Sequence, residues 1–261
     1  MPKAKEAALK ALDLDNNLAE AHVSLGLVKF IYDWDWAGAE NEFKRALQLN
    51  PKYPSLYHFY SIYLACVGGQ FDEAIATAKR GLDLDPLSLP LNNILAGHLY
   101  NAGRFDEAIA QRRKMLEMAP NDPNARYQLG RAYAAKGVYD EAFAEQVQAI
   151  NLWGASKEMI EEHRRVYTTS GWQSYLQWRA RIDLESALKR INQGTGTNLE
   201  PFLVAREYML LGENDKSFEW LNKLYEERNG MLVWNKTGRD LDDLRPDPRY
   251  AELLRRVGFP P

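Results

Sequence analysis

The sequence of 261 residues lacks several features that point to particular compartments or partners. Its one cysteine, Cys66, excludes an internal disulfide and a metal site built from cysteines. No stretch reaches the roughly 18 consecutive apolar residues of a membrane-spanning helix, and the N-terminal MPKAKEAALK lacks the apolar run of a signal peptide. With a net charge of -3, the chain also lacks the positive charge that attracts nucleic acids. We therefore expect no membrane span and no direct binding to nucleic acid.

Motifs of common catalytic and metal sites are absent from the sequence as well. The glycine-rich stretch NQGTGTN at 192–198 lacks the third glycine and the Lys-Ser or Lys-Thr pair of a phosphate-binding loop. Neither a nucleophile elbow nor a zinc-protease helix occurs. The histidines are too far apart to form a close ligand pair, so we expect no metal, no cofactor and no catalysis. They are His22, His58, His98 and His163.

A short sequence recurs at a fixed interval along the chain. The hexapeptide FDEAIA occupies residues 71–76 and 105–110, and YDEAFA occupies 139–144, so each copy begins 34 residues after the previous one. The carboxylates of successive copies hold equivalent places on separate units, so they cannot converge on one acid–base site. A repeat of this length instead indicates a solenoid of stacked units. The register extends through the alanines Ala4, Ala39, Ala74, Ala108 and Ala142.

Each interval contains two runs with apolar and small residues at helical spacing. In the fourth interval PNARYQLGRAYAAKG forms the first helix and YDEAFAEQVQAINL the second, with Gly137 in the turn between them. We expect Asp72, Asp106 and Asp140 to cap the second helices through their side chains. Small residues at matching positions of the first helices predict that the paired helices approach closely. These residues are Gly26, Ser61, Ala96 and Gly130.

Several spaced positions recur together in these intervals. They are Leu129, Gly130, Tyr133, Gly137, Tyr139, Ala142 and Ala149, with Pro51, Pro86 and Pro120 closing their own units. These positions resemble the tetratricopeptide repeat, a 34-residue helix-turn-helix unit, strongly over residues 4–154 and more weakly beyond. The resemblance implies an all-α, right-handed superhelical solenoid of antiparallel helix pairs that binds proteins or peptides.

We predict one solenoid over residues 1–261 with a capping helix at its C-terminal end. Asp247 is placed to cap this helix, Pro248 to begin it and Gly258 to end it. Since residues 1–18 correspond to the second helix of a truncated repeat, we expect a longer protein upstream, or dimerisation through the open N-terminal face. The expected units are 19–53, 54–88, 89–122, 123–156, an extended unit 157–197, and 198–230, followed by the cap at 231–261.

The first full unit departs from the pattern. It carries one extra residue and reads YDWDWAGAE around its turn, with Trp36 in the slot that Phe or Tyr fills elsewhere and Trp34 beside it. An aromatic ligand box is one interpretation of this pair. Packing is the interpretation that we favour, because Trp36 stands where every clear copy has a packed aromatic residue.

The order of these features along the chain has a second resemblance. The LAEAH start, the YDWDW turn, FEWLNKLYEER and the ending LRPDPRYAELLRRVGFPP resemble the C-terminal repeat module of bacterial multidomain signalling proteins and transcriptional regulators. In those proteins a winged-helix, kinase or nucleotide-cyclase domain lies upstream. The resemblance implies a regulatory, partner-binding module in the cytoplasm, or outside it if a membrane span lies upstream.

The family also suggests a binding surface, because its concave groove is lined by the fifth and ninth positions of the first helices. The lysine-and-asparagine clamp of chaperone-binding members is absent, since Val23 and Leu27 hold its leading positions. Transferred to this chain, the lining residues are Val23, Leu27, His58, Ile62, Asn93, Gly97, Tyr127, Arg131, Glu161, Arg165, Phe202 and Arg206.

We expect Arg131, Arg165 and Arg206 to form a ladder for the anionic groups of an extended peptide, with Tyr127 and Phe202 as apolar anchors. The alternative is that Glu161 and neighbouring carboxylates neutralise these arginines as ordinary surface pairs. The sequence therefore favours a non-catalytic protein-interaction scaffold whose partner carries anionic and apolar groups. A small-ligand-sensing module is the alternative, and it would require a closed pocket.

Overall fold

The computed structural model describes residues 2–260, and this range contains helices and no β-strand. The predicted all-α solenoid is thus confirmed. No helix within the same range is both long and apolar enough to cross a membrane. The α-helices are α1 (Pro2–Leu14), α2 (Ala19–Val28), α3 (Trp36–Leu49), α4 (Pro54–Gly68), α5 (Phe71–Leu84), α6 (Leu89–Asn101), α7 (Phe105–Met118), α8 (Pro123–Ala135), α9 (Tyr139–Leu152), α10 (Lys157–Asn192), α11 (Glu200–Leu210), α12 (Asn214–Glu226) and α13 (Pro248–Val257).

Helices α2 to α9 form regular antiparallel pairs that pack as closely as the small residues predict. A Cβ atom on Gly130 would lie 2.8 Å from the carbonyl oxygen of Ala142 on the partner helix α9. A side chain at this position would therefore push the two helices apart. The turn between α8 and α9 contains Gly137 at φ 79°, a left-handed conformation that glycine adopts without steric cost.

The expected capping role of Asp72, Asp106 and Asp140 is wrong. Helices α5, α7 and α9 begin one residue before these aspartates, and the true N-cap residues make no side-chain cap hydrogen bond. The aspartates lie inside the first turn, where a carboxylate acts on the helix dipole instead. In the first full unit Asp35 does cap α3, because its side chain accepts a hydrogen bond from the amide of Gly38.

The extra residue of the first unit is accommodated in a π-helix, η1 (Lys29–Asp33), that extends α2. Trp34 follows in the left-handed conformation at φ 56°. Trp34 stacks on Tyr225 of α12 with ring centroids 5.8 Å apart. Trp36 stacks on Phe259 at 4.9 Å and donates a hydrogen bond from Nε1 to the carbonyl oxygen of Gly258, at 2.6 Å. The preferred interpretation of the two tryptophans as packing residues is confirmed.

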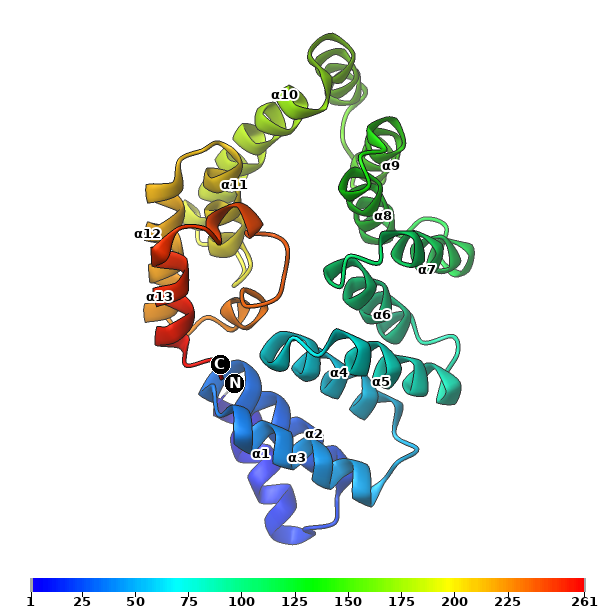
Figure 1. Ribbon diagram of the computed structural model, residues 1–261, viewed down its shortest axis with the longest axis vertical. Coiled ribbons are helices and arrows are strands. Elements are labelled where there is room, and N and C mark those ends of the chain that lie inside the picture. The colour runs from blue at the N-terminus through cyan, green and yellow to red at the C-terminus, as the bar shows by residue number, and fades with distance from the viewer. Residues whose placement is uncertain (1, 261) are drawn as a thin grey trace.

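These contacts close the solenoid into a ring. Figure 1 shows the helices running around a circle, with the N- and C-terminal ends side by side. Trp34 and Trp36 pack against both the N-terminal and the C-terminal hydrophobic cores and so join the two ends. On the outer helix α1, Leu9 and Leu14 remain exposed, and dimerisation through this face stays a prediction.

The long helix α10 is broken at Gly171, which has φ 73° and ψ -179°. Residues 157–170 and 172–192 therefore run in different directions. The second segment packs against α11, and Tyr175, Ala180 and Ala187 are its buried residues. The break decides which side chains of this unit face the inside of the ring.

The C-terminal region contains more than a closing helix. Helix α13 is built as predicted, with Asp247 capping the amide of Arg249, Pro248 at its start and Gly258 at φ 78° at its end. Between the 3-10 helix η2 (Gly230–Trp234) and α13, however, the chain crosses the inside of the ring. We call residues 236–243 the C-terminal loop; the 3-10 helix η3 (Asp242–Leu244) overlaps its end.

Candidate functional site

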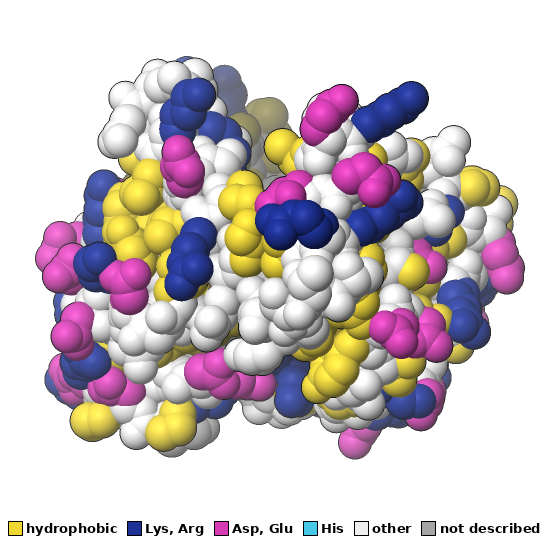
Figure 2. Space-filling model, turned by 90° about the horizontal axis from the view of Figure 1, so that it is seen from above, with side chains coloured by type: hydrophobic (Ala, Val, Ile, Leu, Met, Phe, Trp, Pro, Cys, Tyr) yellow, Lys and Arg dark blue, Asp and Glu magenta, His cyan; other side chains and the backbone are white. Residues whose placement is uncertain are grey.

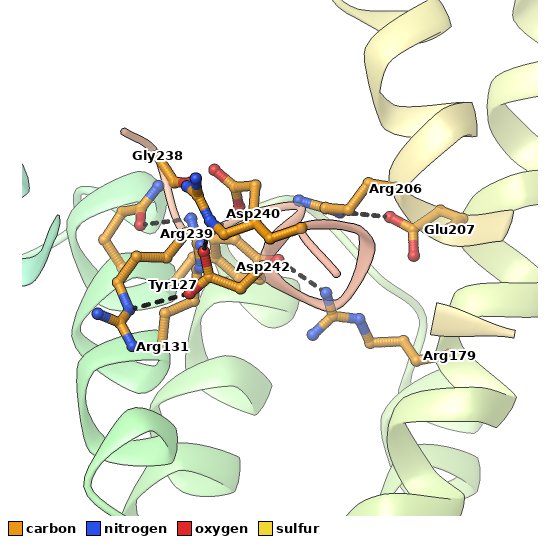
Figure 3. A network of polar contacts seen from close by, with 11 residues as sticks. Tyr127, Arg131, Arg179, Arg206, Glu207, Gly238, Arg239, Asp240 and Asp242 are labelled. Carbon is orange, nitrogen blue, oxygen red and sulfur yellow. Dashed lines mark hydrogen bonds and ion pairs between the residues drawn. The ribbon is translucent and has the colours of Figure 1, made fainter. Parts of the chain in front are cut away.

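A cavity of about 440 Å³ lies on the concave side of the ring, where the C-terminal loop faces α8, α10 and α11. Its wall contains aromatic rings, arginines and aspartates, together with Gln146 and several aliphatic side chains. Figure 3 shows Arg239, Asp240 and Asp242 of the loop between Arg131 on one side and Arg179 and Arg206 on the other. The aromatic and basic lining residues are Tyr100, Tyr127, Trp172, Arg131, Arg179, Arg206 and Arg239.

Three separate helices supply the central charges, and we call Arg131, Arg179 and Arg206 the arginine cluster. Arg131 lies one helical turn after Tyr127 on α8, so both side chains face the cavity. Arg179 comes from the second segment of α10 and Arg206 from α11. Since the three residues lie far apart in sequence, only the curvature of the solenoid brings them together.

Arg179 is the most extensively bonded member of the cluster. It donates to the hydroxyl of Tyr127 at 2.8 Å and to Oε1 of Gln146 at 2.7 Å, and its Nε lies 3.1 Å from Asp183. Its guanidinium also lies over the Tyr127 ring, 5.2 Å from the centroid. These contacts hold the Arg179 fork in one orientation at the cavity wall.

Arg131 is paired with a residue 109 positions further along the chain. Its Nη2 donates to Oδ1 of Asp240 at 2.5 Å, and its guanidinium lies 5.1 Å from the centroid of the Tyr100 ring. The side chains of Arg131 and Asp240 are 20% and 31% exposed, so the pair lies at the edge of the solvent. The arginine cluster thus already holds one carboxylate that comes from outside the regular repeats.

Arg206 is paired with its chain neighbour, Glu207. Burial raises the pKa of the Glu207 carboxyl, although Arg206 opposes the shift. For Arg206 itself burial would lower the pKa, but Tyr127 and Glu207 outweigh burial and raise it. The guanidinium therefore keeps its charge at the wall of the cavity.

Tyr127 reports the electrostatic potential inside the cavity. Burial alone would raise the pKa of its phenol, but Arg179, Arg206 and Arg131 together outweigh burial and lower it. A buried phenol with a lowered pKa means that negative charge is favoured at this point. The three arginines thus favour negative charge at the Tyr127 oxygen, beside a lining that also contains Asp240, Asp242 and Asp243.

The remaining predicted groove residues of the early units lie elsewhere. Val23 and Ile62 are buried in the N-terminal core, and Leu27 packs against them. His58 is half-buried, and burial lowers the pKa of its imidazole. Asn93 accepts a hydrogen bond from the buried Arg112. None of these residues lines the cavity.

The arginine ladder is not formed as predicted. Arg165 lies on the exposed surface and pairs with Glu162 at 2.6 Å, which matches the alternative of ordinary surface pairs. Glu161 is exposed and pairs with Arg164. Phe202 is 5% exposed and belongs to the C-terminal core, so it is not free to anchor a ligand. Of the predicted residues, the structure brings Tyr127, Arg131 and Arg206 together at the cavity.

Arg179 takes the place that was expected for Arg165, because the break at Gly171 directs the second segment of α10 into the ring. A sequence signal for this residue exists. Trp172, Leu176 and Arg179 follow one another at the four- and three-residue spacing of a single helix face, and all three line the cavity.

Comparison with known proteins supports the repeat. The family model described as "Tetratricopeptide repeat" matches residues 99–145. Over 86 residues the chain is 37% identical to the transcriptional regulator HilA of Salmonella typhimurium strain LT2. This match covers 33% of the chain and only 15% of the length of the regulator.

Solved structures show a similar arrangement of helices. YrrB, whose structure is described as that of a tetratricopeptide-repeat protein with an unusual peptide-binding site, has a TM-score of 0.50 and 24% identity, covering 63% of this chain and 84% of YrrB. The type IV pilus biogenesis factor PilW has a TM-score of 0.55 and 15% identity, covering 93% of this chain and 90% of PilW. At these identities the likeness concerns the fold alone. The 34-residue register, the stacked helix pairs and the family model over residues 99–145 show that the chain contains tetratricopeptide repeats.

Proposed function

We propose that this protein is a non-catalytic interaction scaffold that binds an extended acidic segment of a partner protein at the arginine cluster. The tetratricopeptide-repeat fold supports a role in protein–protein interaction. The observation that carries the finer proposal is the cavity on the concave side, where Arg131, Arg179 and Arg206 face one space and Asp240 is already bound.

The chemistry of the wall suits such a segment. Arginine presents a planar fork of N–H donors that matches a carboxylate, and a charge-assisted hydrogen bond is stronger than a neutral one. The rings of Tyr100, Tyr127 and Trp172 provide apolar surface between the charges. An acidic residue flanked by apolar side chains therefore complements this cavity better than a basic or purely polar segment.

The proposal includes a regulatory setting for the module. The similarity to a transcriptional regulator covers 33% of this chain and supports its place in a larger bacterial regulatory or signalling protein. Since bacterial transcription takes place in the cytoplasm, we propose that the module works there. In this setting, partner capture by the ring would control the activity of a domain upstream.

A labelled peptide tests the proposal. We expect a fluorescein-labelled decamer of alternating glutamate and leucine to bind saturably in fluorescence polarisation, with an affinity that falls as salt is added. A glutamine–leucine decamer should not bind. Arg179→Gln and Arg206→Gln should each weaken binding about tenfold, because each removes charge-assisted hydrogen bonds.

The matched control is Arg165→Gln, which removes an equal charge from the exposed surface outside the cavity. It should leave the affinity unchanged. Circular dichroism of each variant verifies that the helices are intact. Equal binding by wild type and both cavity variants would exclude the arginine cluster as the site.

A second candidate function is the sensing of a small anionic ligand. The volume of about 440 Å³ favours it, because pockets for small molecules measure roughly 300–1,000 Å³. Thermal unfolding with succinate and citrate separates the two functions. A saturable rise in Tm that Arg179→Gln abolishes would support the small ligand, whereas peptide binding without any such rise would exclude these two acids.

A further inference from the structure

We infer that the C-terminal loop, residues 236–243, is a built-in competitor for the acidic partner segment: Asp240 occupies the arginine cluster until the partner replaces it. The inference rests on the function proposed above. It explains why a segment outside the regular repeats crosses the concave side of the ring (Figures 1 and 3).

The loop contacts the inner side of successive units at single points. Nζ of Lys236 donates to the carbonyl oxygen of Val67 at the end of α4, at 3.0 Å. The guanidinium of Arg239 lies over the ring of Phe105 at the start of α7, 5.3 Å from its centroid. Asp240 then reaches Arg131 on α8. The loop thus follows the path along which an extended ligand would cross consecutive units.

Residues 236–240 of the loop bury little apolar surface, whereas the residues on either side are firmly packed. Leu232 and Val233 before it, Leu241 within it and Leu244 after it are buried in the hydrophobic cores. Of its contact residues, Lys236 and Asp240 are partly buried and Arg239 is exposed. Segments with few buried apolar contacts open locally at low free energy. Asp240 can therefore leave Arg131 while Leu241 and Leu244 keep the chain that follows it in the core.

Charge balance selects Asp240 as the carboxylate that an incoming ligand replaces. Arg179 pairs with Asp183 one turn further along α10, and Arg206 pairs with the adjacent Glu207. These two carboxylates are fixed beside their arginines by the helices that carry both partners. Asp240 is different, since it approaches Arg131 from a separate segment of the chain. Exchange at Arg131 preserves the charge balance without moving a helix.

Because Asp240 is tethered to the same chain as Arg131, only some kinds of partner can displace it. A short tether gives a bound group an effective concentration in the millimolar range. A single free carboxylate is therefore a poor competitor for Asp240. A partner segment that contacts Arg131 and Arg179 together, with an apolar group against Tyr127, makes contacts that Asp240 does not.

The test compares two aspartates of the same region. Asp240→Asn removes the ion pair to Arg131 and should tighten binding of the glutamate–leucine decamer about tenfold. Asp243 also borders the cavity, but makes no ion pair within residues 2–260. Asp243→Asn removes the same charge, so the ratio between the two variants isolates the effect of the ion pair. A ratio near one would overturn the competitor role.

Hydrogen exchange of the wild type provides a measurement that needs no variant. Saturation with the decamer should speed amide exchange of residues 236–240 and leave Leu241 and α13 protected. Unchanged exchange of the loop under saturation would contradict displacement. If Arg179→Gln weakens binding while Asp240→Asn does not tighten it, the competitor role fails and the scaffold function stands. If the wild type binds no decamer and Asp240→Asn binds none either, the proposed function fails.

Discussion

The regular half of the ring, α2 to α9, and the irregular half, α10 to α13, are built from different kinds of information. In the regular half, residues at equivalent positions have the same packing role in successive units. Gly26 on α2 and Gly130 on α8, for example, both lie where the partner helix approaches closely. In the irregular half the long second segment of α10, the C-terminal loop and α13 each occur once. The difference teaches that the period provides the shape of the ring, whereas the departures from the period provide its charged site and its closure.

The distribution of charged side chains also differs between the outer surface and the inside of the ring. Figure 2 shows acidic and basic side chains interspersed over one face, without a large patch of either sign. Inside the ring, in contrast, α10, α11 and the C-terminal loop add Arg179, Arg206 and Arg239 to the Arg131 of a regular unit, and each of these arginines is paired with a carboxylate. Both halves are therefore required for the cavity.

The largest effect is expected from a substitution that separates the two halves at their junction. Trp36→Ala removes the stack on Phe259 and the hydrogen bond to Gly258. We expect the free energy of unfolding to fall by about 3 kcal/mol, as for other large aromatic truncations. Urea unfolding measures the loss, and small-angle X-ray scattering should show a larger radius of gyration as the ring opens. The control Trp153→Ala, at a half-exposed position away from the junction, should leave the radius unchanged.

A pH series tests how much a buried histidine of the regular half contributes to the stability of the protein. His98 is buried on α6 against the hydroxyl of Ser61, and burial, together with the nearby His58, lowers the pKa of its imidazole to about 4. Since the unfolded pKa is about 6.5, the neutral form stabilises the fold above this pH, and that stability is lost as the pH falls from 6.5 to 4. We expect a loss of about 2–3 kcal/mol across this window. In His98→Gln the urea midpoint should change less between pH 6.5 and 4 than in the wild type. An equal change in both proteins would show that His98 does not cause the loss of stability.

The smallest expected effect sharpens the comparison within the regular half. Gly130→Ala places a Cβ atom 2.8 Å from a backbone oxygen of α9, so it should destabilise the protein by about 1–3 kcal/mol. Gly97 is also helical, but nothing lies within 4 Å of its Cβ position. Gly97→Ala should therefore stabilise the protein by about 0.5–1 kcal/mol through helix propensity. Opposite signs in thermal unfolding would verify that the period encodes close helix contacts; equal effects would count against it.

Much of the regular half could be predicted from the sequence because its determinants are local. Helical spacing, Gly137 in a turn and Gly130 at a close contact all depend on residues within one interval. The capping prediction failed because helix starts vary by one residue, and a cap depends on that single position. A shift of one residue placed Asp72 and its equivalents inside the helix.

The candidate site could be predicted only in part, because it depends on rotations that accumulate over several units. Tyr127, Arg131 and Arg206 were found from their repeat positions. Arg179 was missed since the predicted lining was confined to first helices, and Arg179 lies on the second segment of α10. The pairing of Asp240 with Arg131 spans 109 residues, and no periodic pattern specifies so distant a contact.

Closure of the ring has a consequence for how this chain evolves. Open solenoids lengthen easily by duplicating a unit, because each unit contacts only its neighbours. Here the first full unit also contacts the segment directly after the last helix, through Trp36 and Phe259. One additional 34-residue unit would carry that helix away from Trp36, and one unit fewer would bring the two ends into collision. The contact between Trp36 and Phe259 thus restricts the number of units that this solenoid can contain.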